Sequence, residues 1–541
     1  GVVLLALSIL GESESPMTAK VHREAVRRIA QNFFPTSWKP SGICYEGPNY
    51  AIVGYRYVAP FCEALRRAGG PDLIGRSGVR HAMTYQMYQW MPMQDCAPIG
   101  DNTGYGRRTF AAEYLLGMDR TRDREGLYRW RTTTKRRYLD PLITYLWYPL
   151  DLEPRGPAEA GLPTSKYFEV TADRAGYVFS RSRWEDRQAA FFAFVTRFEK
   201  CNHQHYDMNS FLFGGRGTLF ATHRLLFPYG HPNHGVDYEH NLVVVDGGGW
   251  PKQEGPGCGH VNSTDGVLVG LALGDTADYV RGDAKWSYRD NSVQGDDPAI
   301  RAERACLFAK RGDAPYLLIL DDIQYRDRRQ RYDWLWYAPN LPIAGSGTLE
   351  DPVTITAENG RCAIRFLAPA RPKVAVKPAL GRRRTHLKRL EVPVHGNRVQ
   401  FVAVASIEPV EGPGVKVLPL EAEADVPVAG ALRLRLPDGA EDTVAWQSEE
   451  DRVQCGRTMT AGDMETDGLL AWVRVREGKL VGYVLGEGTY LKWKGRTLVR
   501  AAGRDSVSVS AGPEGARTRG RLRTRKGLPE IPPEGCRAVR P

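Results

Sequence analysis

The sequence predicts an α+β multidomain protein, in which part of an (α/α) helical toroid is followed by a large antiparallel β-sandwich. Three observations carry this prediction. Hydrophobic residues recur at helical spacing through residues 1–150, a segment rich in proline and glycine follows at 151–165, and short β-branched and aromatic runs dominate from residue 166. A length of 541 residues is sufficient for more than one hydrophobic core.

Residues 1–150 are predicted to form the C-terminal part of the toroid. Thr18–Asn32 is amphipathic, with Val21, Ala25 and Ile29 near helical spacing. Further helices are expected at Tyr50–Ala68, His81–Trp90 and Arg108–Met118. Repeated helices joined by aromatic-rich loops suit a toroid.

The β-rich part is predicted to follow the linker at 151–165. Its boundaries are expected at 166–440 for the sandwich, 441–515 for a small terminal β-unit and 516–541 for a basic flexible tail. The strands that indicate a sandwich share short length, β-branched or aromatic residues and charged turns at their ends. They include Tyr167–Thr171, Gly176–Ser180, Ala189–Val195, Tyr316–Asp321, Tyr332–Tyr337, Val353–Leu367 and Arg398–Ile407.

The amino-acid composition limits the kinds of molecule that the chain is expected to bind. The chain is 42% hydrophobic and 25% charged, as in globular proteins, and its net charge is +11. A basic protein can meet nucleic acid, anionic lipid or an acidic polymer, but no helix-turn-helix, RNA-binding or zinc-finger spacing favours nucleic acid. Nine dispersed cysteines indicate neither a disulfide framework nor a thiolate metal site. No apolar run approaches the ~20 residues of a membrane span.

Histidines are concentrated in one stretch, since seven of the eleven fall between residues 203 and 260. A hairpin is predicted at Phe211–Phe220 around a glycine-rich turn, and another strand at Asn241–Asp246. Strands from separate parts of the chain can therefore bring His205, His223 and His240 together, and three imidazoles form a normal zinc site. Each histidine taken singly also fits a surface loop or a hydrogen-bonded core position.

Two segments here carry a family resemblance. Asn202–Phe211 (NHQHYDMNSF) and His240–Gly247 (HNLVVVDG) resemble the C-terminal β-domain of the heparinase II/III-like polysaccharide lyases. The resemblance implies that His203 faces the substrate cleft and that His205 and His240 hold a structural zinc ion. The third ligand departs from the family, which has an aspartate where this chain has His223. A neutral histidine can replace a carboxylate at zinc.

A second segment, Ser41–Tyr55 (SGICYEGPNYAIVGY), resembles the family's Glu-Gly-Pro-x-Tyr run at the head of a helix that lines the cleft. The resemblance implies that Tyr50 is the proton-shuttling residue, with Tyr55 as the alternative. Without the resemblance, Tyr50 reads as an aromatic residue that packs on the core. Gly100–Asn102 resembles a family loop that faces the cleft. The substrate-contacting residues implied in these two segments are Glu46, Asn49, Tyr55, Asp101 and Asn102.

The resemblance implies β-elimination of a uronic-acid polysaccharide in the periplasm or outside the cell. It also implies that the chain lacks an upstream part of the toroid, including an Asn/His motif that recognises the substrate carboxylate, and Gly1–Leu10 reads as the inside of a domain rather than as a signal peptide. Two other classes stay open: a non-catalytic carbohydrate-binding protein on the same scaffold, and a hydrolase with a catalytic metal. The polysaccharide and the oligomeric state are left open by the sequence.

Overall fold

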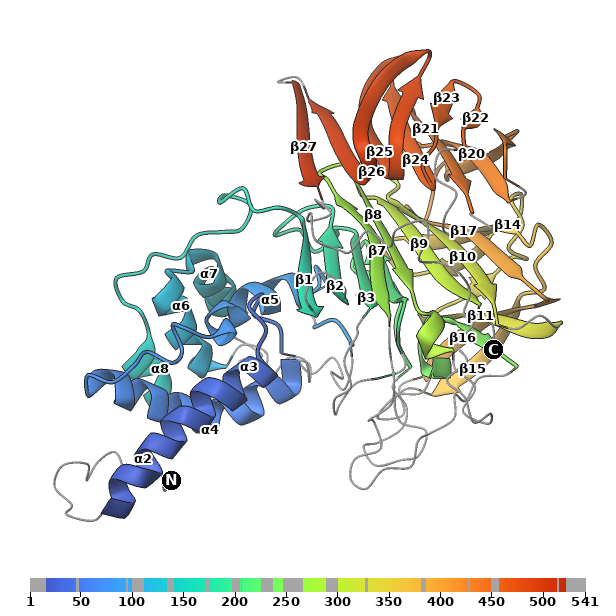
Figure 1. Ribbon diagram of the computed structural model, residues 1–541. Helices are drawn as coiled ribbons and strands as arrows, with labels where there is room; N and C mark the ends of the chain where they lie inside the picture. The colour runs from blue at the N-terminus through green and yellow to red at the C-terminus, as the bar shows by residue number, and fades with distance from the viewer. Residues whose placement is uncertain are drawn as a thin grey trace, which may run out of the picture.

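The structure, a computed structural model, describes residues 16–44, 48–93, 96–99, 111–133, 141–171, 175–196, 205, 207–224, 237–246, 266–288, 300–325, 329–380, 386–426, 428–448, 457–512 and 515–521. Its helices gather at one side, and the strands form stacked layers beside them (Figure 1). A helical part and a large antiparallel β-sandwich are therefore both present. Closure of the helices into a toroid stays a prediction.

The helical unit packs around a core rich in aromatic side chains, among them Trp38, Tyr114 and Trp130. The helices predicted at 18–32, 50–68 and 81–90 are confirmed, and the fourth begins later than predicted. Their bounds are α2 (Pro16–Arg28), a π-helical turn (Ile29–Phe33), α3 (Phe34–Ser37), α4 (Pro48–Arg67), α5 (Ala82–Gln89), α6 (Leu115–Thr121), α7 (Arg124–Thr132) and α8 (Pro141–Trp147), with 3-10 turns at Gly78–His81 and Ala112–Tyr114.

A buried carboxylate joins α4 to α6. Glu63 is 5% exposed, and it accepts hydrogen bonds from Arg66 (3.0 Å), Arg67 (2.8 Å) and Arg120 (2.5 Å). Burial alone would raise the pKa of Glu63, but the hydrogen bonds from Arg66 and Arg67 and the charge of Arg120 outweigh it and hold this pKa at about 2. The folded state therefore favours the ionised form of Glu63.

We expect this carboxylate to make the helical unit sensitive to acid. Because its pKa is lower in the folded chain than its ordinary value of 4.5, its contribution to stability is present above that pH and is lost as the pH falls toward 2. The free energy of unfolding of Glu63→Gln, measured against pH, should lie on the order of 2–3 kcal/mol below that of the wild type near pH 7 and converge with it near pH 2. Glu24→Gln, which removes an exposed pair on α2, should change little. A pH-independent gap for Glu63→Gln would contradict the assignment.

The first β-layer contains two sheets placed edge to edge. A five-stranded sheet in the order β1-β2-β3-β4-β5 meets a four-stranded sheet in the order β15-β16-β11-β6, through a bridge between Thr222 and Tyr337. The strands are β1 (Ser165–Thr171), β2 (Ala175–Arg181), β3 (Phe191–Thr196), β4 (Ser210–Gly215), β5 (Thr218–Ala221), β6 (Val243–Val245), β11 (Gln330–Pro339), β15 (Ala375–Leu380) and β16 (His386–Gly396).

An eight-stranded antiparallel sheet forms the second layer, in the order β12-β13-β14-β17-β10-β9-β8-β7. Both faces of its central strands are covered by other layers, and apolar residues therefore fill both faces in parts of these strands, as at residues 317–320 of β10. The strands are β7 (Val267–Leu273), β8 (Ala277–Asp283), β9 (Arg301–Ala309), β10 (Tyr316–Gln324), β12 (Ile343–Ala344), β13 (Val353–Thr356), β14 (Arg361–Ala368) and β17 (Val399–Glu408).

The third layer is a ten-stranded C-terminal sheet that covers the outer face of the second (Figure 1). The expected boundary at 441 falls within β21, which pairs with β20, so this sheet begins at β18 instead. Part of the expected tail is also a strand, because β27 pairs with β26. The strands are β18 (Lys416–Leu420), β19 (Glu423–Ala424), β20 (Ala429–Arg435), β21 (Ala440–Gln447), β22 (Met459–Ala461), β23 (Met464–Thr466), β24 (Leu470–Arg476), β25 (Lys479–Trp493), β26 (Arg496–Gly512) and β27 (Gly515–Arg521).

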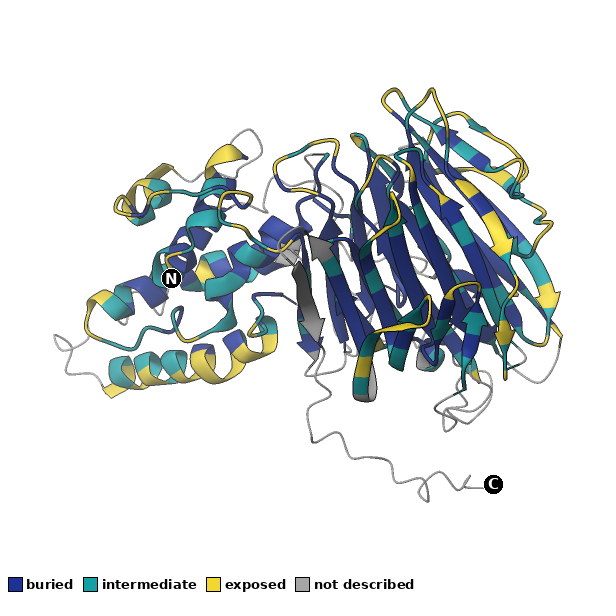
Figure 2. Ribbon diagram, turned by 90° about the horizontal axis from the view of Figure 1, so that it is seen from above, coloured by how far each residue is buried: buried dark blue, intermediate teal, exposed yellow. Residues whose placement is uncertain are grey.

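Apolar cores hold the layers together. Tyr85 and Tyr88 of α5 pack against Phe168 and Phe179 of the five-stranded sheet, which fixes the helical unit on the sandwich. The first and second β-layers share a core that includes Phe211, Phe308, Trp334, Trp336 and Phe401, and the second and third share one that includes Leu318, Val404, Leu434, Trp472 and Val484. Figure 2 shows buried strands in the middle of the β-part and exposed residues in many of the loops that connect strands.

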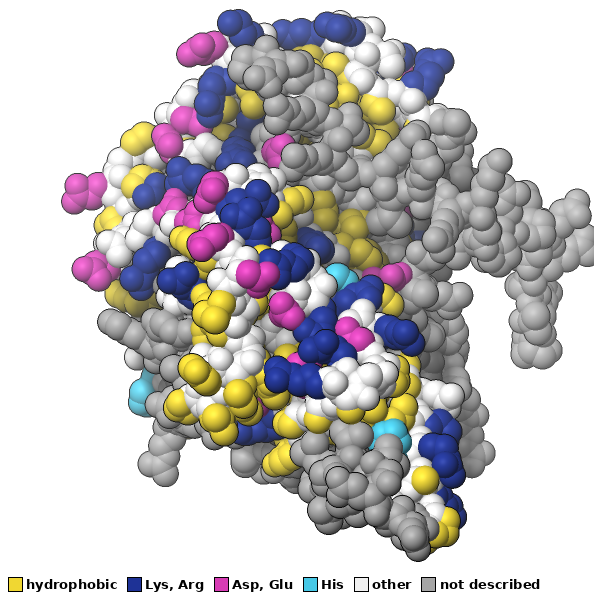
Figure 3. Space-filling model, turned by 90° about the vertical axis from the view of Figure 1, so that its left-hand side faces the viewer, with side chains coloured by type: hydrophobic (Ala, Val, Ile, Leu, Met, Phe, Trp, Pro, Cys, Tyr) yellow, Lys and Arg dark blue, Asp and Glu magenta, His cyan; other side chains and the backbone are white. Residues whose placement is uncertain are grey.

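Surface charge is mixed on the face that Figure 3 presents. Lys and Arg side chains lie among Asp, Glu and apolar side chains there. Among the residues that the structure describes, the basic side chains of this face therefore do not form a single patch. Among the helices that the structure describes, none combines the length and the apolar character needed to cross a membrane.

Candidate functional site

Two backbone contacts bring the histidine-bearing segments together. The predicted hairpin is confirmed as β4 and β5, and its turn uses Arg216 and Gly217, both at positive φ (50° and 79°). Beyond β5, the Thr222 amide donates to the Tyr337 carbonyl of β11 at 2.9 Å, and the Arg224 amide donates to the Glu239 carbonyl at 2.9 Å. The residue between them, His223, therefore lies beside the segment that leads into β6.

The three predicted zinc ligands are adjacent and buried. The ring centroids of His223 and His240 lie 4.5 Å apart, and those of His205 and His240 lie 5.2 Å apart. Their exposed fractions are 1% for His205, 4% for His223 and 0% for His240. The sequence left two alternatives for each single histidine, a surface loop or a hydrogen-bonded core position. The burial of all three side chains excludes the surface loop. The three imidazoles come from the segments that precede β4, follow β5 and precede β6.

Asn241, the residue after His240, fixes this cluster. Its side-chain amide donates to the Phe211 carbonyl of β4 (2.8 Å) and to the Thr222 carbonyl (2.9 Å), and its side-chain oxygen accepts from the Tyr337 amide of β11 (2.7 Å). One buried side chain thus joins both edges of the sheet junction. Sequence reasoning missed this role, although the position of Asn241 directly after His240 was an available signal.

A buried ion pair supports the same backbone from the second layer. The Arg304 guanidinium binds both carboxylate oxygens of Asp321 (2.6 and 2.9 Å), and it also donates to the carbonyls of Asn209 (3.0 Å) and Asn241 (2.6 Å). The Trp334 indole donates to Asp321 at 3.1 Å. Burial alone would lower the pKa of Arg304, but the charge of Asp321 raises it above its ordinary value. The sequence alone gave no sign of this support.

The histidine cluster fits zinc in the chemistry of its donors, because imidazole is a preferred zinc ligand and the three rings are neighbours. In the side-chain arrangement seen here, the described residues contain no group of three or more His, Cys, Asp or Glu side chains that could hold a metal ion as it stands. A zinc site would therefore require the imidazoles to turn toward a common centre. The zinc assignment stays a prediction.

The structure describes only some of the other predicted site residues. Asn49 and Tyr50 lie in the first turn of α4, which begins at Pro48. Tyr55 is fully buried in the helical core, where its ring stacks on Tyr114 at 5.8 Å, so its position does not suit contact with a substrate. Glu46, Asp101, Asn102 and His203 lie outside the described residues.

Comparisons with known proteins find a likeness in fold. No model of a known protein family matches the chain, and no curated protein matches it by sequence. Among solved structures, a heparinase III structure, the BT4657 gene product, superposes with a TM-score of 0.58 at 11% identity over 83% of this chain. The heparan sulfate lyase HepC from Pedobacter heparinus gives a TM-score of 0.58 at 12% identity, also over 83%. The chain has the heparinase III fold.

The chain covers only part of each of these two solved structures. The chain spans 64% of the heparinase III structure and 65% of the HepC structure, which is less than two thirds of either. The heparinase III fold accounts for the helical unit beside stacked antiparallel sheets. It is also the fold that the sequence resemblance implies.

Proposed function

We propose that the chain belongs to a polysaccharide lyase that cleaves a uronic-acid-containing polysaccharide by β-elimination. The observation that carries the proposal is the heparinase III fold, combined with the buried cluster of His205, His223 and His240 in the segments that resemble these lyases. The net charge of +11 suits an acidic polymer. Export to the periplasm or the medium belongs to the same proposal.

The reaction divides into three tasks. A base removes the proton beside the uronate carboxylate, an acid returns a proton to the departing 4-linked oxygen, and nearby donors stabilise the charge that develops on the carboxylate. We assign both proton transfers to Tyr50, because a cationic setting can lower a tyrosine pKa from about 10 toward the working pH. His203 acts as the opposing base or holds the carboxylate. The remaining substrate contacts are assigned to Glu46, Asn49, Asp101 and Asn102.

A zinc ion is proposed as a structural component held by His205, His223 and His240. When bound, it would supply a cross-link between the segment before β4, the end of β5 and the start of β6. Asn241 and Arg304 already hold the backbone of this junction. His203, two residues from His205, would thereby be fixed toward the cleft.

We expect about one zinc ion per wild-type chain by elemental analysis, since three histidines with a fourth ligand form a common zinc site. His205→Ala and His240→Ala should each lose the metal and lower the thermal unfolding midpoint. His395→Ala, which changes an exposed histidine of β16, is the matched control and should keep both. A folded wild type without zinc, or His240→Ala with full zinc content, would refute the ligand assignment.

The proposed reaction is tested by ultraviolet absorbance during incubation with a panel of uronic-acid polymers. Elimination leaves a double bond conjugated with the carboxylate, so a lyase gives a rising absorbance. A hydrolase shortens the polymer without this signal, and a binding protein retains it unchanged. A folded chain that shows either of these results would overturn the proposal. The departure at His223 makes the binding protein the second candidate.

A further inference from the structure

A cavity lies between the second and third β-layers, away from the histidine cluster. Its volume is about 220 Å³, and it is lined from the eight-stranded sheet by Arg281, Arg301, Glu303, Asp322 and Gln400 and from the C-terminal sheet by Trp446, Gln447 and Ser448. The same face of the eight-stranded sheet is apolar where the two layers touch, as at Leu318 and Val404. The change from apolar to polar side chains along one face coincides with the opening of the space.

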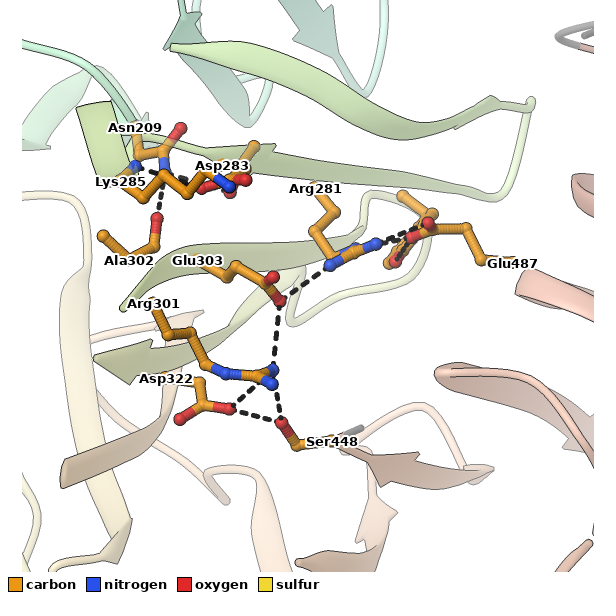
Figure 4. Close-up of polar contacts among 12 residues, drawn as sticks. Asn209, Arg281, Asp283, Lys285, Arg301, Ala302, Glu303, Asp322, Ser448 and Glu487 are labelled. Carbon is orange, nitrogen blue, oxygen red and sulfur yellow. Dashed lines mark hydrogen bonds and ion pairs between the residues drawn. The ribbon is translucent and has the colours of Figure 1, made fainter. Parts of the chain in front are cut away.

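One wall of the cavity is a ladder of alternating charges (Figure 4). Arg281 binds Glu487 on β25 through two hydrogen bonds of 2.6 Å and Glu303 through one of 2.7 Å. Arg301 continues the ladder to Asp322 (3.3 Å) and Ser448 (3.3 Å). Arg398 closes it, with hydrogen bonds of 2.8 and 2.6 Å to Asp322. The ladder thus pairs three arginines with three carboxylates and is balanced in charge. Arg398 and Glu487 complete it from outside the cavity lining, which also includes Asp283 and Asp321.

The ladder differs from the sealed ion pairs of the same protein. Side chains of Arg281, Glu303, Arg301 and Asp322 are 11–16% exposed. Those of Arg304 and Asp321 are each 2% exposed. Water therefore reaches the ladder through the cavity, and its donors and acceptors can exchange water for ligand hydroxyls.

The rest of the cavity lining is apolar and aromatic. Tyr279, Leu320 and Val402 belong to the same sheet as the ladder, and Trp446 and Leu469 come from the C-terminal part of the chain. Gln447 of the cavity lining is 7% exposed; its side-chain nitrogen donates to the Gly468 carbonyl (3.0 Å), whereas its side-chain oxygen has no hydrogen-bond partner. A buried acceptor without a partner is costly, and a ligand donor would satisfy it.

We propose that this cavity binds one uncharged sugar unit of a glycan, at a site separate from the histidine cluster. A sugar ring presents both donors and acceptors at its edge and C–H groups on its face, which match a polar ladder next to apolar and aromatic side chains. The volume lies below the range of about 300–1,000 Å³ for drug-sized ligands, as suits a single small unit. Each arginine of the ladder already binds a carboxylate of the protein. The carboxylate of a uronate would therefore find no unpaired arginine in the ladder.

The test measures binding of N-acetylglucosamine, glucose and glucuronate to the full chain by saturation-transfer NMR. We expect saturable binding of at least one neutral sugar, and weaker binding of glucuronate. Arg301→Met leaves Asp322 bound to Arg398 and Glu303 bound to Arg281, and Gln400→Ala breaks no ion pair, so both variants should fold. Each should weaken neutral-sugar binding at least tenfold.

Arg435→Met is the matched control, because Arg435 forms an exposed pair with Glu441 on the same C-terminal sheet. It should bind neutral sugar as the wild type does. Absence of neutral-sugar binding, tighter binding of glucuronate, or equal binding by folded Gln400→Ala and the wild type would overturn the proposal. The readout is binding and does not depend on lyase activity, so failure of the proposed lyase reaction would leave this result intact.

Discussion

Arg304→Met is expected to lower the free energy of unfolding by about 3–5 kcal/mol, because it leaves the Asp321 carboxylate buried without its cation. The substitution should also disturb the positions of the side chains in the histidine cluster. Arg304 donates to the carbonyls of Asn209 and Asn241, and Asn241 is the side chain that joins β4, the end of β5 and β11. Urea unfolding measures the first effect, and the imidazole NMR signals of the cluster measure the second.

Arg474→Met provides the matched comparison. Arg474 binds both oxygens of the buried Asp442 at 2.7 Å, and Trp472 donates to that carboxylate at 3.0 Å, which repeats the chemistry of the Arg304 pair in the C-terminal sheet. We expect a similar loss of stability from Arg474→Met but unchanged histidine signals. Equal disturbance of the cluster by both variants would mean that Arg304 acts through general stability alone.

Tyr50→Phe is expected to reduce the turnover number by about 10²–10⁴-fold, since it removes the hydroxyl that we propose carries the proton in both steps. This expectation rests on the proposed function. The substrate contacts of the other residues remain, so KM should change far less than kcat. Initial rates of ultraviolet-absorbing product, measured against polymer concentration, separate the two constants.

Tyr55→Phe is the control on the same helix. The Tyr55 hydroxyl is buried without a hydrogen-bond partner, and burial raises its pKa well above the ordinary value of 10. Removing it should leave turnover unchanged and stability equal or slightly higher. A large loss of turnover in Tyr55→Phe with little loss in Tyr50→Phe would reverse the assignment.

Local patterns predicted much of the secondary structure. The β4–β5 hairpin was predictable because glycines at 214, 215 and 217 interrupt an alternating apolar run, and α4 because aromatic and apolar residues recur at helical spacing before a Gly-Gly-Pro stop. The grouping of His205, His223 and His240 followed from strand spacing and family resemblance together. Each of these signals lies within a short stretch of chain.

Features that depend on distant pairing were not predictable. Arg304 and Asp321 lie in the strands β9 and β10, where a charged residue normally indicates a solvent-facing position, and both are buried because another layer covers each face of their sheet. The predicted boundary at 441 divides the C-terminal sheet. The sequences of β20 and β21 look like those of ordinary sandwich strands and do not show that these two strands pair with each other. The cavity is lined by residues from two sheets, so no single segment of the sequence encodes it.

The most direct test of the lyase proposal is the mass of the products released from a uronic-acid oligosaccharide of defined length. Elimination predicts two fragments whose masses sum to that of the starting oligosaccharide, with the unsaturated unit on one of them. Fragments whose summed mass exceeds the starting mass by one water would show hydrolysis and would contradict the account.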